Sequence, residues 1–508
     1  MSQTARISRT YQVHGQTQTR HLPTDRAETW DASGGSSKET CRLLSLFAPA
    51  PTLDAHQFLL DAYGQERFFW SEPSAIGGFT IAGTGIAAEI RIPPILDADG
   101  EPSTMPGYRF DEVAGQAHEL FLDALFLPAE LNRSVTDTRV WLDHPARPRL
   151  FGGFAFQDDF VPDNTWSSFS PAQFVLPHFQ YTCDGDKSYL TITALVSTHE
   201  NVEESLKGLR DALLARLATP LAELLQPIQV TDLRFPMSAD QWEDAVQSAV
   251  SAIHDGQIEK VVLSRVCEAR TDQPIDAAAV LAYLDQHYRD CYRFIFEPVP
   301  NHAFFGATPE LLIRKRANHI ETMALAGSAA RSRDQALDNT FAEALLMSDK
   351  DRHEHQLVVD SIRAKLESEV EVLSFPDSPV MLKLSNIQHL LTPIEGELVD
   401  SQTGILSLVR LLHPTPAMGG VPADRALAFL RRTEPVPRGW YAAPIGWLDT
   451  RNEGVFAVAI RSAVTQHNRV WLYAGAGIVG DSEPDKEWAE TALKFRPMLD
   501  ALGVAEAF

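Results

Sequence analysis

The sequence predicts an α+β fold with largely antiparallel sheets. Segments with the alternating pattern of strands mix with segments of helical periodicity, but they lack the regular spacing of parallel βαβ units. The chain has 508 residues, of which 44% are hydrophobic and 22% charged, the composition of an ordinary globular protein. A chain of this length can bury a large core without disulfides or metals. We found no repeat of fixed period.

The pattern of residues 1–235 predicts a tail followed by a lobe rich in strands. Residues 1–40 are polar and end in SGGSSKET, which predicts a disordered tail. Residues 41–235 have globular patterning. In this part we expect strands within 79–92, 140–156, 174–182 and 188–196, a loop at 93–107, and helices at 111–128 and 201–225, the last interrupted at Pro220.

A boundary near residues 226–237 separates this lobe from residues 236–508. Ser238 followed by Gln241 has the spacing of a capping box, which predicts a helix that ends at Gly256. Strands are expected at 258–270, 303–315, 319–326, 455–465 and 470–479, and helices at 335–347, at 350–368 and from about 485.

Charge, cysteine content and hydropathy bear on the protein's partners and on its cellular compartment. The net charge of −24 disfavours nucleic acid and anionic membranes, which bind basic surfaces. The four cysteines form no CxxC pair, and they predict reduced thiols in a cytoplasmic protein. No stretch approaches about 18 uninterrupted apolar residues, and the N-terminus lacks the apolar segment of a secretory signal. Its Arg, Ser and Thr content faintly resembles a transit peptide.

Two residues within predicted strands are candidates for proton transfer. Lys260 shares one strand face with Val262 and Ser264; if that face is buried, the amine loses its proton more easily and can act as a base. Glu310 follows Pro309 among apolar neighbours, which favours a protonated carboxyl that can act as an acid. The alternatives are a lysine that reaches water and a glutamate on a sheet edge.

Two predicted helices carry acidic clusters. Glu487, Glu490 and Lys494 lie at i, i+3 and i+7, on one helix face, although such charges usually form a solvated stripe. Asp351 and Glu354 form a second i, i+3 pair. Oxygen-only ligands from separate segments suit Mg²⁺. The HEH motif at 353–355 does not predict zinc, because its two histidines point about 200° apart on a helix.

Nine ordered motifs between residues 258 and 496 resemble the chorismate-utilising enzymes, and within them the isochorismate synthases. These motifs are EKVVLSR, FGATPELL, ETMALAGSAARS, DRHEHQLVVDSI, LLHPTPAMGGVP, RGWYAAPIGW, FAVAIRSA, YAGAGIV and EPDKEWAETALKF. The resemblance implies one large unit with antiparallel sheets packed face to face, helices outside and the site in a cleft. In that unit, 41–235 would be the N-terminal lobe and 236–508 the chorismate-binding catalytic region.

Three segments place the chain within this group. Lys260 resembles the base of members that use water as nucleophile, HPTPAMGG (413–420) resembles the isochorismate synthase form, and ALAGS (324–328) lacks the lysine of aminodeoxychorismate synthases. Ser328 stands where Thr is commoner, and Ala443 where Gly is usual. A salicylate synthase, which adds pyruvate elimination, is the nearest alternative. A non-catalytic binding protein of the same fold is a more remote one.

The resemblance implies a Mg²⁺-dependent, reversible conversion of chorismate to isochorismate, by attack of water at C2 and loss of the C4 hydroxyl. The implied base is Lys260 and the implied acid is Glu310. The implied metal ligands are Glu354 and Glu490, with Glu487 directly or through water. The implied substrate-binding residues are Gly327, Ser328, His389, Thr415, Tyr441, Arg461, Gly475 and Lys494.

The expected partners are few. Chorismate is the expected small-molecule substrate, and no glutamine amidotransferase subunit is expected because the implied nucleophile is water, not ammonia. We expect a monomer that contacts neither nucleic acid nor a membrane. The residues do not indicate whether siderophore, menaquinone or salicylate biosynthesis uses the product.

Overall fold

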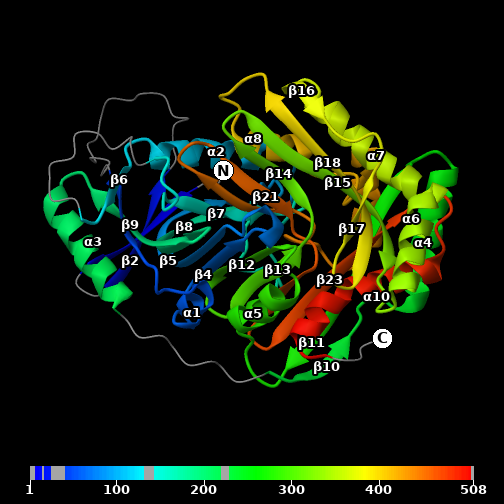
Figure 1. Ribbon diagram of the computed structural model, residues 1–508, viewed down its shortest axis with the longest axis horizontal. Coiled ribbons are helices and arrows are strands. Elements are labelled where there is room, and N and C mark those ends of the chain that lie inside the picture. The colour runs from blue at the N-terminus through cyan, green and yellow to red at the C-terminus, as the bar shows by residue number, and fades with distance from the viewer. Residues whose placement is uncertain (1–5, 14–15, 24–40, 131–141, 219–227, 505–508) are drawn as a thin grey trace. The chain divides into compact units, whose positions relative to one another are not determined.

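Two compact units are present in the computed structural model, which describes residues 6–13, 16–23, 41–130, 142–218 and 228–504 (Figure 1). Unit 1 comprises residues 1–225, 294–300 and 446–452, and unit 2 comprises residues 226–293, 301–445 and 453–508. Helices mix with mostly antiparallel strands, which confirms the predicted α+β class. In the described ranges, no helix has the length and apolar character needed to cross a membrane. The expected division at residues 235/236 stays a prediction.

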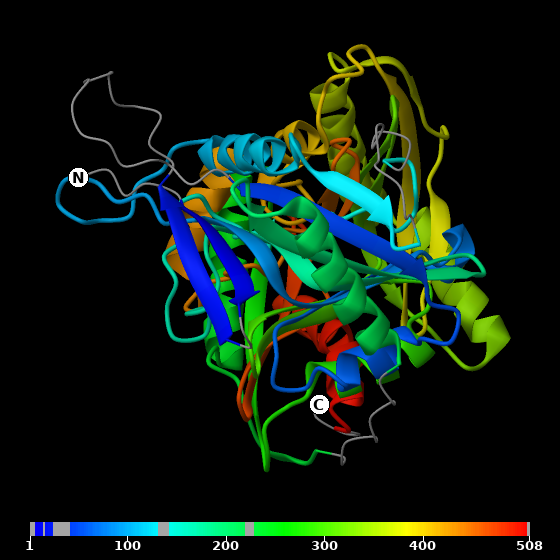
Figure 2. The same cartoon turned by 90° about the vertical axis from the view of Figure 1, so that its left-hand side faces the viewer.

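The strands of unit 1 centre on β5, which pairs antiparallel with β1, β4 and β8. β1 and β2 pair with each other and lie side by side in Figure 2, in dark blue. They are the described parts of the expected tail, whose other residues all fall outside the described ranges. The strands are β1 (Arg6–Val13), β2 (Gln16–Pro23), β3 (Cys41–Pro49), β4 (Arg67–Ser71), β5 (Thr80–Ile92), β6 (Leu125–Pro128), β7 (Arg149–Phe154), β8 (Ala172–Asp184) and β9 (Lys187–Ser197).

The helices of unit 1 are α1 (Ala55–Leu60), α2 (Tyr108–Phe121) and α3 (Val202–Leu217), and Ser74–Ile76 form a short 3₁₀ helix. The helix expected over 111–128 was wrong at its C-terminal end. There Leu125–Pro128 pair in parallel with Leu44–Phe47 of β3, because an apolar segment next to a strand gains more from sheet pairing than from helical propensity. The expected interruption at Pro220 lies outside the described residues.

Unit 2 contains two antiparallel ladders. In the first, the strands follow the order β10, β11, β23, β22, β13. In the second, β21, β14, β15 and β18 follow one another, and β16 and β17 both pair with β18. β19 (Gly420–Val421) pairs with the start of β11. The bounds of the first ladder are β10 (Val230–Arg234), β11 (Lys260–Thr271), β13 (His302–Thr308), β22 (Ser462–Gln466) and β23 (Arg469–Ile478). Those of the second are β14 (Leu311–Arg316), β15 (His319–Ala330), β16 (Val370–Ser374), β17 (Val380–Lys383), β18 (Ile387–Leu398) and β21 (Gly454–Val458). β12 (Tyr292–Val299) and β20 (Pro444–Asp449) have residues in both units.

The helices of unit 2 include two that carry predicted site residues. α7 packs on β15, and α10 packs on β23 (Figure 1). The predicted capping box is confirmed at the start of α4, where the Ser238 and Gln241 side chains each accept a hydrogen bond from the other residue's backbone N–H. These helices are α4 (Ala239–His254), α5 (Ala277–His287), α6 (Gln335–Met347), α7 (Asp349–Leu366), α8 (Ile405–Leu412), α9 (Ala423–Thr433) and α10 (Pro484–Ala501).

The chain passes twice between the two ladders, and each passage carries a predicted site residue. Residues 309–310 link β13 to β14, and residues 459–461 link β21 to β22, so the single strands expected at 303–315 and 455–465 are each broken in two. The passages are joined by backbone bonds: Val458 N donates to the Glu310 carbonyl at 3.0 Å, and Ala307 N donates to the Arg461 carbonyl at 3.1 Å. The two residues are therefore held by backbone at neighbouring points.

Candidate active site

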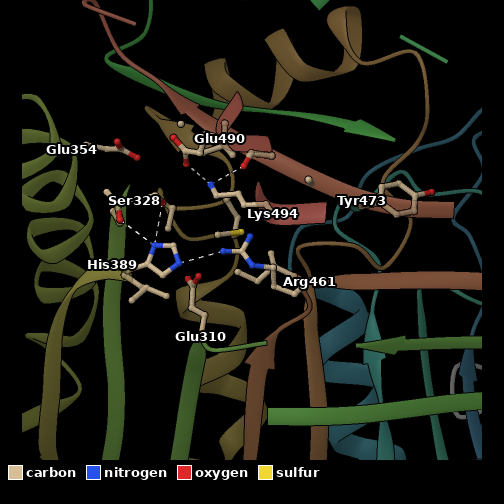
Figure 3. Close-up of a pocket in the computed structure, with 18 of the residues that line it drawn as sticks. Glu310, Ser328, Glu354, His389, Arg461, Tyr473, Glu490 and Lys494 are labelled. Atoms are coloured by element: carbon tan, nitrogen blue, oxygen red, sulfur yellow. Dashed lines mark hydrogen bonds and ion pairs between the residues drawn. The ribbon is translucent and has the colours of Figure 1, made fainter. Parts of the chain in front are cut away.

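A cavity lies between the two ladders of unit 2 and holds most of the predicted site residues (Figure 3). Its space free of atoms measures about 590 Å³, which includes a part open to solvent. Eleven of the thirteen predicted residues line it: Lys260, Glu310, Gly327, Ser328, Glu354, His389, Tyr441, Arg461, Gly475, Glu490 and Lys494. Residues up to 234 positions apart in the sequence, from Lys260 to Lys494, thus meet in one space.

Lys260 opens β11 and contacts a carboxylate of α7. Its side chain is 1% exposed, and its Nζ lies 2.9 Å from Glu354 Oε1. Gly477 makes room for this pair, because a Cβ there would come within 2.3 Å of the same Glu354 oxygen and 3.2 Å of Lys260 Cε. Lys260 therefore makes a buried contact with a carboxylate that is itself one of the predicted metal ligands.

Glu310 lies at the passage between β13 and β14 with its side chain buried. Burial raises its pKa to about 8, although the positive charges of Lys260, Lys494 and Arg461 act in the opposite direction. A carboxyl with this pKa is mostly protonated at neutral pH and can donate a proton. The sequence-based expectation of an un-ionised acid therefore has a physical basis in this structure.

Arg461, His389 and Ser328 form a hydrogen-bonded row along one wall. Arg461 Nη2 lies 3.2 Å from His389 Nε2, and His389 Nδ1 lies 3.0 Å from the Gly327 carbonyl and 3.1 Å from Ser328 Oγ. Burial, together with the charges of Arg461 and Lys494, lowers the pKa of His389 to about 3. The imidazole is thus neutral.

Tyr441 supplies a second buried donor on the wall near Arg461. Burial raises the pKa of its phenol to about 12, so its hydroxyl stays protonated. Its ring stacks on Tyr473 with centroids 5.0 Å apart. A guanidinium and a phenol on one wall can bind a carboxylate.

α10 presents its charged residues to the cavity and to α7. Lys494 Nζ lies 2.5 Å from Glu490 Oε1 and donates to the Gly475 carbonyl at 2.8 Å. Burial acts to raise the pKa of Glu490, but the charge and hydrogen bond of Lys494 outweigh it, so the pKa lies below its ordinary value. Glu487 instead contacts Lys350 of α7 at 2.8 Å, and burial together with the charge of Glu490 raises its pKa.

These carboxylates provide the oxygen donors that Mg²⁺ prefers, but they are not gathered around one point. Within the described ranges, no three His, Cys, Asp or Glu side chains lie close enough to hold a metal ion. Instead each of the three predicted ligands pairs with a lysine: Glu354 with Lys260, Glu487 with Lys350, and Glu490 with Lys494. The donor chemistry and the high density of carboxylates fit a hard divalent cation. Binding one would require the carboxylates to leave their lysines.

Two predicted residues do not line the cavity. Glu487 is buried behind it against Lys350. Thr415 is buried as well, and its backbone carbonyl accepts hydrogen bonds from the amides of Met418 and Gly419. Ala417 and Met418, from the same segment, line the cavity in its place.

Sequence reasoning missed further residues that shape the site. Val262 was placed on the face of Lys260 but not proposed as a site residue, and it lines the cavity. Tyr473 lines it too, and strand alternation could have found it, because it shares the face of Gly475. The buried Arg438 gave no such signal. It binds Glu434 through two nitrogens, at 2.9 and 2.6 Å, and also donates to the carbonyls of Val262 and Met418. It therefore joins the strand of the proposed base to the segment carrying Met418.

The sequence of the chain matches one protein family and several of its named members. Residues 28–503 match the family model described as "Chorismate binding enzyme". The chain is 36% identical to "Isochorismate synthase MenF" of Bacillus subtilis over 443 residues, covering 87% of this chain and 88% of that protein. It is 40% identical to "Salicylate biosynthesis isochorismate synthase" of Pseudomonas aeruginosa over 368 residues, covering 71% and 75%.

A solved structure resembles the fold along nearly the whole chain. It is that of MenF, described as the menaquinone-specific isochorismate synthase from Escherichia coli. The TM-score is 0.71 at 25% sequence identity, and the match covers 91% of this chain and 95% of the other. The residues that line the cavity described above all fall within residues 28–503, the range that the family model matches.

Proposed function

Since the chain belongs to the chorismate-binding enzyme family, we propose that it is an isochorismate synthase, an isomerase that interconverts chorismate and isochorismate. The relatives at 36 and 40% identity both carry the name isochorismate synthase. The observation that carries the proposal for this chain's own site is that Lys260 and Glu310 line one cavity, together with Arg461 and Tyr441.

The proposed reaction moves a hydroxyl group from C4 to C2 of the ring. A water molecule bonds to C2 and gives a proton to the Lys260 amine, the two ring double bonds shift, and the C4–oxygen bond breaks. The departing hydroxide takes the proton of Glu310 and leaves as water. Each proton transfer of this kind contributes about 10²–10⁴-fold to the rate. Reversal requires only that both groups exchange roles, which agrees with a reversible isomerisation.

The remaining residues hold the substrate. We propose that Arg461 and Tyr441 bind the enolpyruvyl carboxylate, and that Gly327, Ser328 and His389 line the ring. Lys494 and the Gly475 backbone would lie beside the ring carboxylate. The chain's negative net charge makes such local cations necessary for an anionic substrate.

We further propose that Mg²⁺ is held by Glu354 and Glu490, with Glu487 directly or through water. A bound Mg²⁺ would neutralise the ring carboxylate and the surrounding acidic side chains. Lys260 contacts this same Glu354 carboxylate at 2.9 Å, so the proposed base would lie next to the proposed metal.

Product analysis tests the proposal directly. Purified protein is incubated with chorismate and Mg²⁺ at neutral pH, and the products are separated by chromatography. Isochorismate in equilibrium with chorismate is expected, and Lys260→Met should abolish it. Salicylate and pyruvate as main products would show a salicylate synthase instead, and unchanged turnover by Lys260→Met would remove the proposed base. A chain that binds chorismate but does not convert it would be the binding protein.

We also propose the simplest setting for this activity, a cytoplasmic monomer without an amidotransferase subunit. Cys41, Cys183, Cys267 and Cys291 all lie in the described ranges and no two of them are joined by a disulfide, which supports a reducing compartment. A water nucleophile removes the need for an ammonia-supplying partner. Light scattering of the purified chain measures the oligomeric state.

A further inference from the structure

His389 lies between two groups whose chemistry leaves it only one arrangement of protons (Figure 3). On one side, Arg461 Nη2 is a donor only, so His389 Nε2, at 3.2 Å, must accept. On the other side, the Gly327 carbonyl is an acceptor only, so His389 Nδ1, at 3.0 Å, must donate. Neither partner can exchange its role. The ring therefore carries its hydrogen on Nδ1, with Nε2 bare.

The same arrangement determines which hydrogen-bonding role the Ser328 hydroxyl has toward the cavity. Its Oγ lies 3.1 Å from the same Nδ1, so Ser328 accepts a share of the Nδ1–H bond. A hydroxyl that accepts in this way keeps its own hydrogen for another acceptor. Because Ser328 lines the cavity, that hydrogen is available to an oxygen of the substrate.

Protonation of the ring would break this row. A hydrogen on Nε2 would meet the N–H of Arg461 head to head, and it would add a positive charge beside Arg461 and near Lys494. Glu490 is the charged group that acts in favour of protonation, and Lys494 already neutralises it at 2.5 Å. Burial disfavours the charged ring as well. His389 is thus unsuited to donate a proton as an acid.

We propose that His389 is a positioning residue in one fixed neutral tautomer, and that it aims the Arg461 guanidinium and the Ser328 hydroxyl at the substrate. The proposal deepens the proposed function, on which it rests, by giving His389 a role distinct from acid–base chemistry. The acid role remains with Glu310. The contact matters most for Arg461, because it fixes the position of the guanidinium in the cavity. The backbone of Arg461 has a positive φ of 50°.

Nuclear magnetic resonance of ¹⁵N-histidine-labelled protein tests the tautomer without any turnover. The His389 signals are identified by their loss in His389→Gln. We expect Nδ1 at the protonated position and Nε2 at the bare position, unchanged from pH 8 to about pH 5, a range in which an ordinary histidine titrates. Protonation on Nε2, or titration of the ring within this range, would overturn the proposal.

Kinetics of three variants test the positioning role. His389→Phe removes both contacts and should raise KM for chorismate about 10- to 100-fold, the cost of a lost hydrogen bond to a charged group, with a smaller change in kcat. His389→Gln places a carbonyl oxygen near the position of Nε2, so it should return KM to within a few-fold of wild type. His302→Phe removes a buried histidine of β13 outside the cavity and should leave KM unchanged.

Two kinetic results would contradict the positioning role of His389. If His389 were an acid, both His389 variants would lose about 10²–10⁴-fold in kcat and one limb of the pH profile. Equal losses in the Phe and Gln variants would refute the positioning role. A wild-type chain without activity on chorismate would refute the proposed function, while the resonance experiment would still decide the tautomer.

Discussion

Replacing Glu310 with glutamine should reduce activity and, at high pH, make the protein more resistant to unfolding. Glutamine has the shape of the protonated side chain but cannot donate the carboxyl proton. We therefore expect kcat to fall about 10²–10⁴-fold in Glu310→Gln. In the wild type, kcat should fall about tenfold per pH unit above about pH 8, where the carboxyl ionises.

The effect on stability follows from the pKa of Glu310, which is about 8 in the folded chain against an ordinary value of 4.5. Between these values the folded chain retains a proton that the unfolded chain has released. The free energy of unfolding therefore falls as the pH rises through this window, and Glu310 adds no further change above about pH 8. The difference corresponds to roughly 5 kcal/mol at most. Glu310→Gln has no such loss.

Urea unfolding followed by tryptophan fluorescence at about pH 4.5 and pH 9 measures this effect. The difference in unfolding free energy between Glu310→Gln and wild type should be near zero at the lower pH and should favour the variant by several kcal/mol at the higher one. Glu395→Gln, at an exposed position of β18, should show no such pH-dependent difference. A difference that stays constant with pH, or a Glu310→Gln variant with wild-type kcat, would refute the reasoning.

Two further substitutions test the cavity wall and its cations. Gly477→Ala places a methyl group 2.3 Å from an oxygen of Glu354, so kcat/KM for chorismate should fall about 100-fold through displaced side chains, whereas Gly480→Ala, whose methyl group would have ordinary contacts, should remain active. A fully active Gly477→Ala would show that this carboxylate needs no fixed place. Lys350→Met removes the ammonium beside an α10 carboxylate, so the Mg²⁺ concentration for half-maximal activity should fall about tenfold. The control is Lys486→Met, which removes an exposed lysine of α10. An unchanged Mg²⁺ requirement in Lys350→Met would contradict the expectation.

Local periodicity predicted much of this architecture. Alternation along residues 258–270 placed Lys260 and Val262 on one face, and both line the cavity. Helical spacing placed Glu490 and Lys494 together, and they form an ion pair. These predictions succeeded because the relevant geometry repeats over two to four residues. The assignment of the family came from nine motifs in order, which no single periodic pattern could have supplied.

Features that depend on distant segments were not predictable in this way. Residues 303–315 have the pattern of one strand, yet the chain leaves one ladder at Thr308 and enters the other at Leu311. The contact of Glu487 with Lys350 joins two helices 137 positions apart, and it draws Glu487 away from the cavity. Leu125–Pro128 were wrongly assigned to a helix because only the neighbouring β3 makes them a strand. In each case the deciding partner lies far along the chain.

The paired passages between the ladders have a consequence for attempts to redesign the reaction. Glu310, the proposed proton donor, and Arg461 both have backbone carbonyls that accept hydrogen bonds across the two passages, so we expect exchange of neighbouring side chains to leave their spacing intact. Ala417 and Met418 instead come from a loop on another part of the wall. That loop can therefore be varied separately from the two passages, and substitutions at Ala417 or Met418 would change the cavity wall while Glu310 and Arg461 keep their backbone hydrogen bonds.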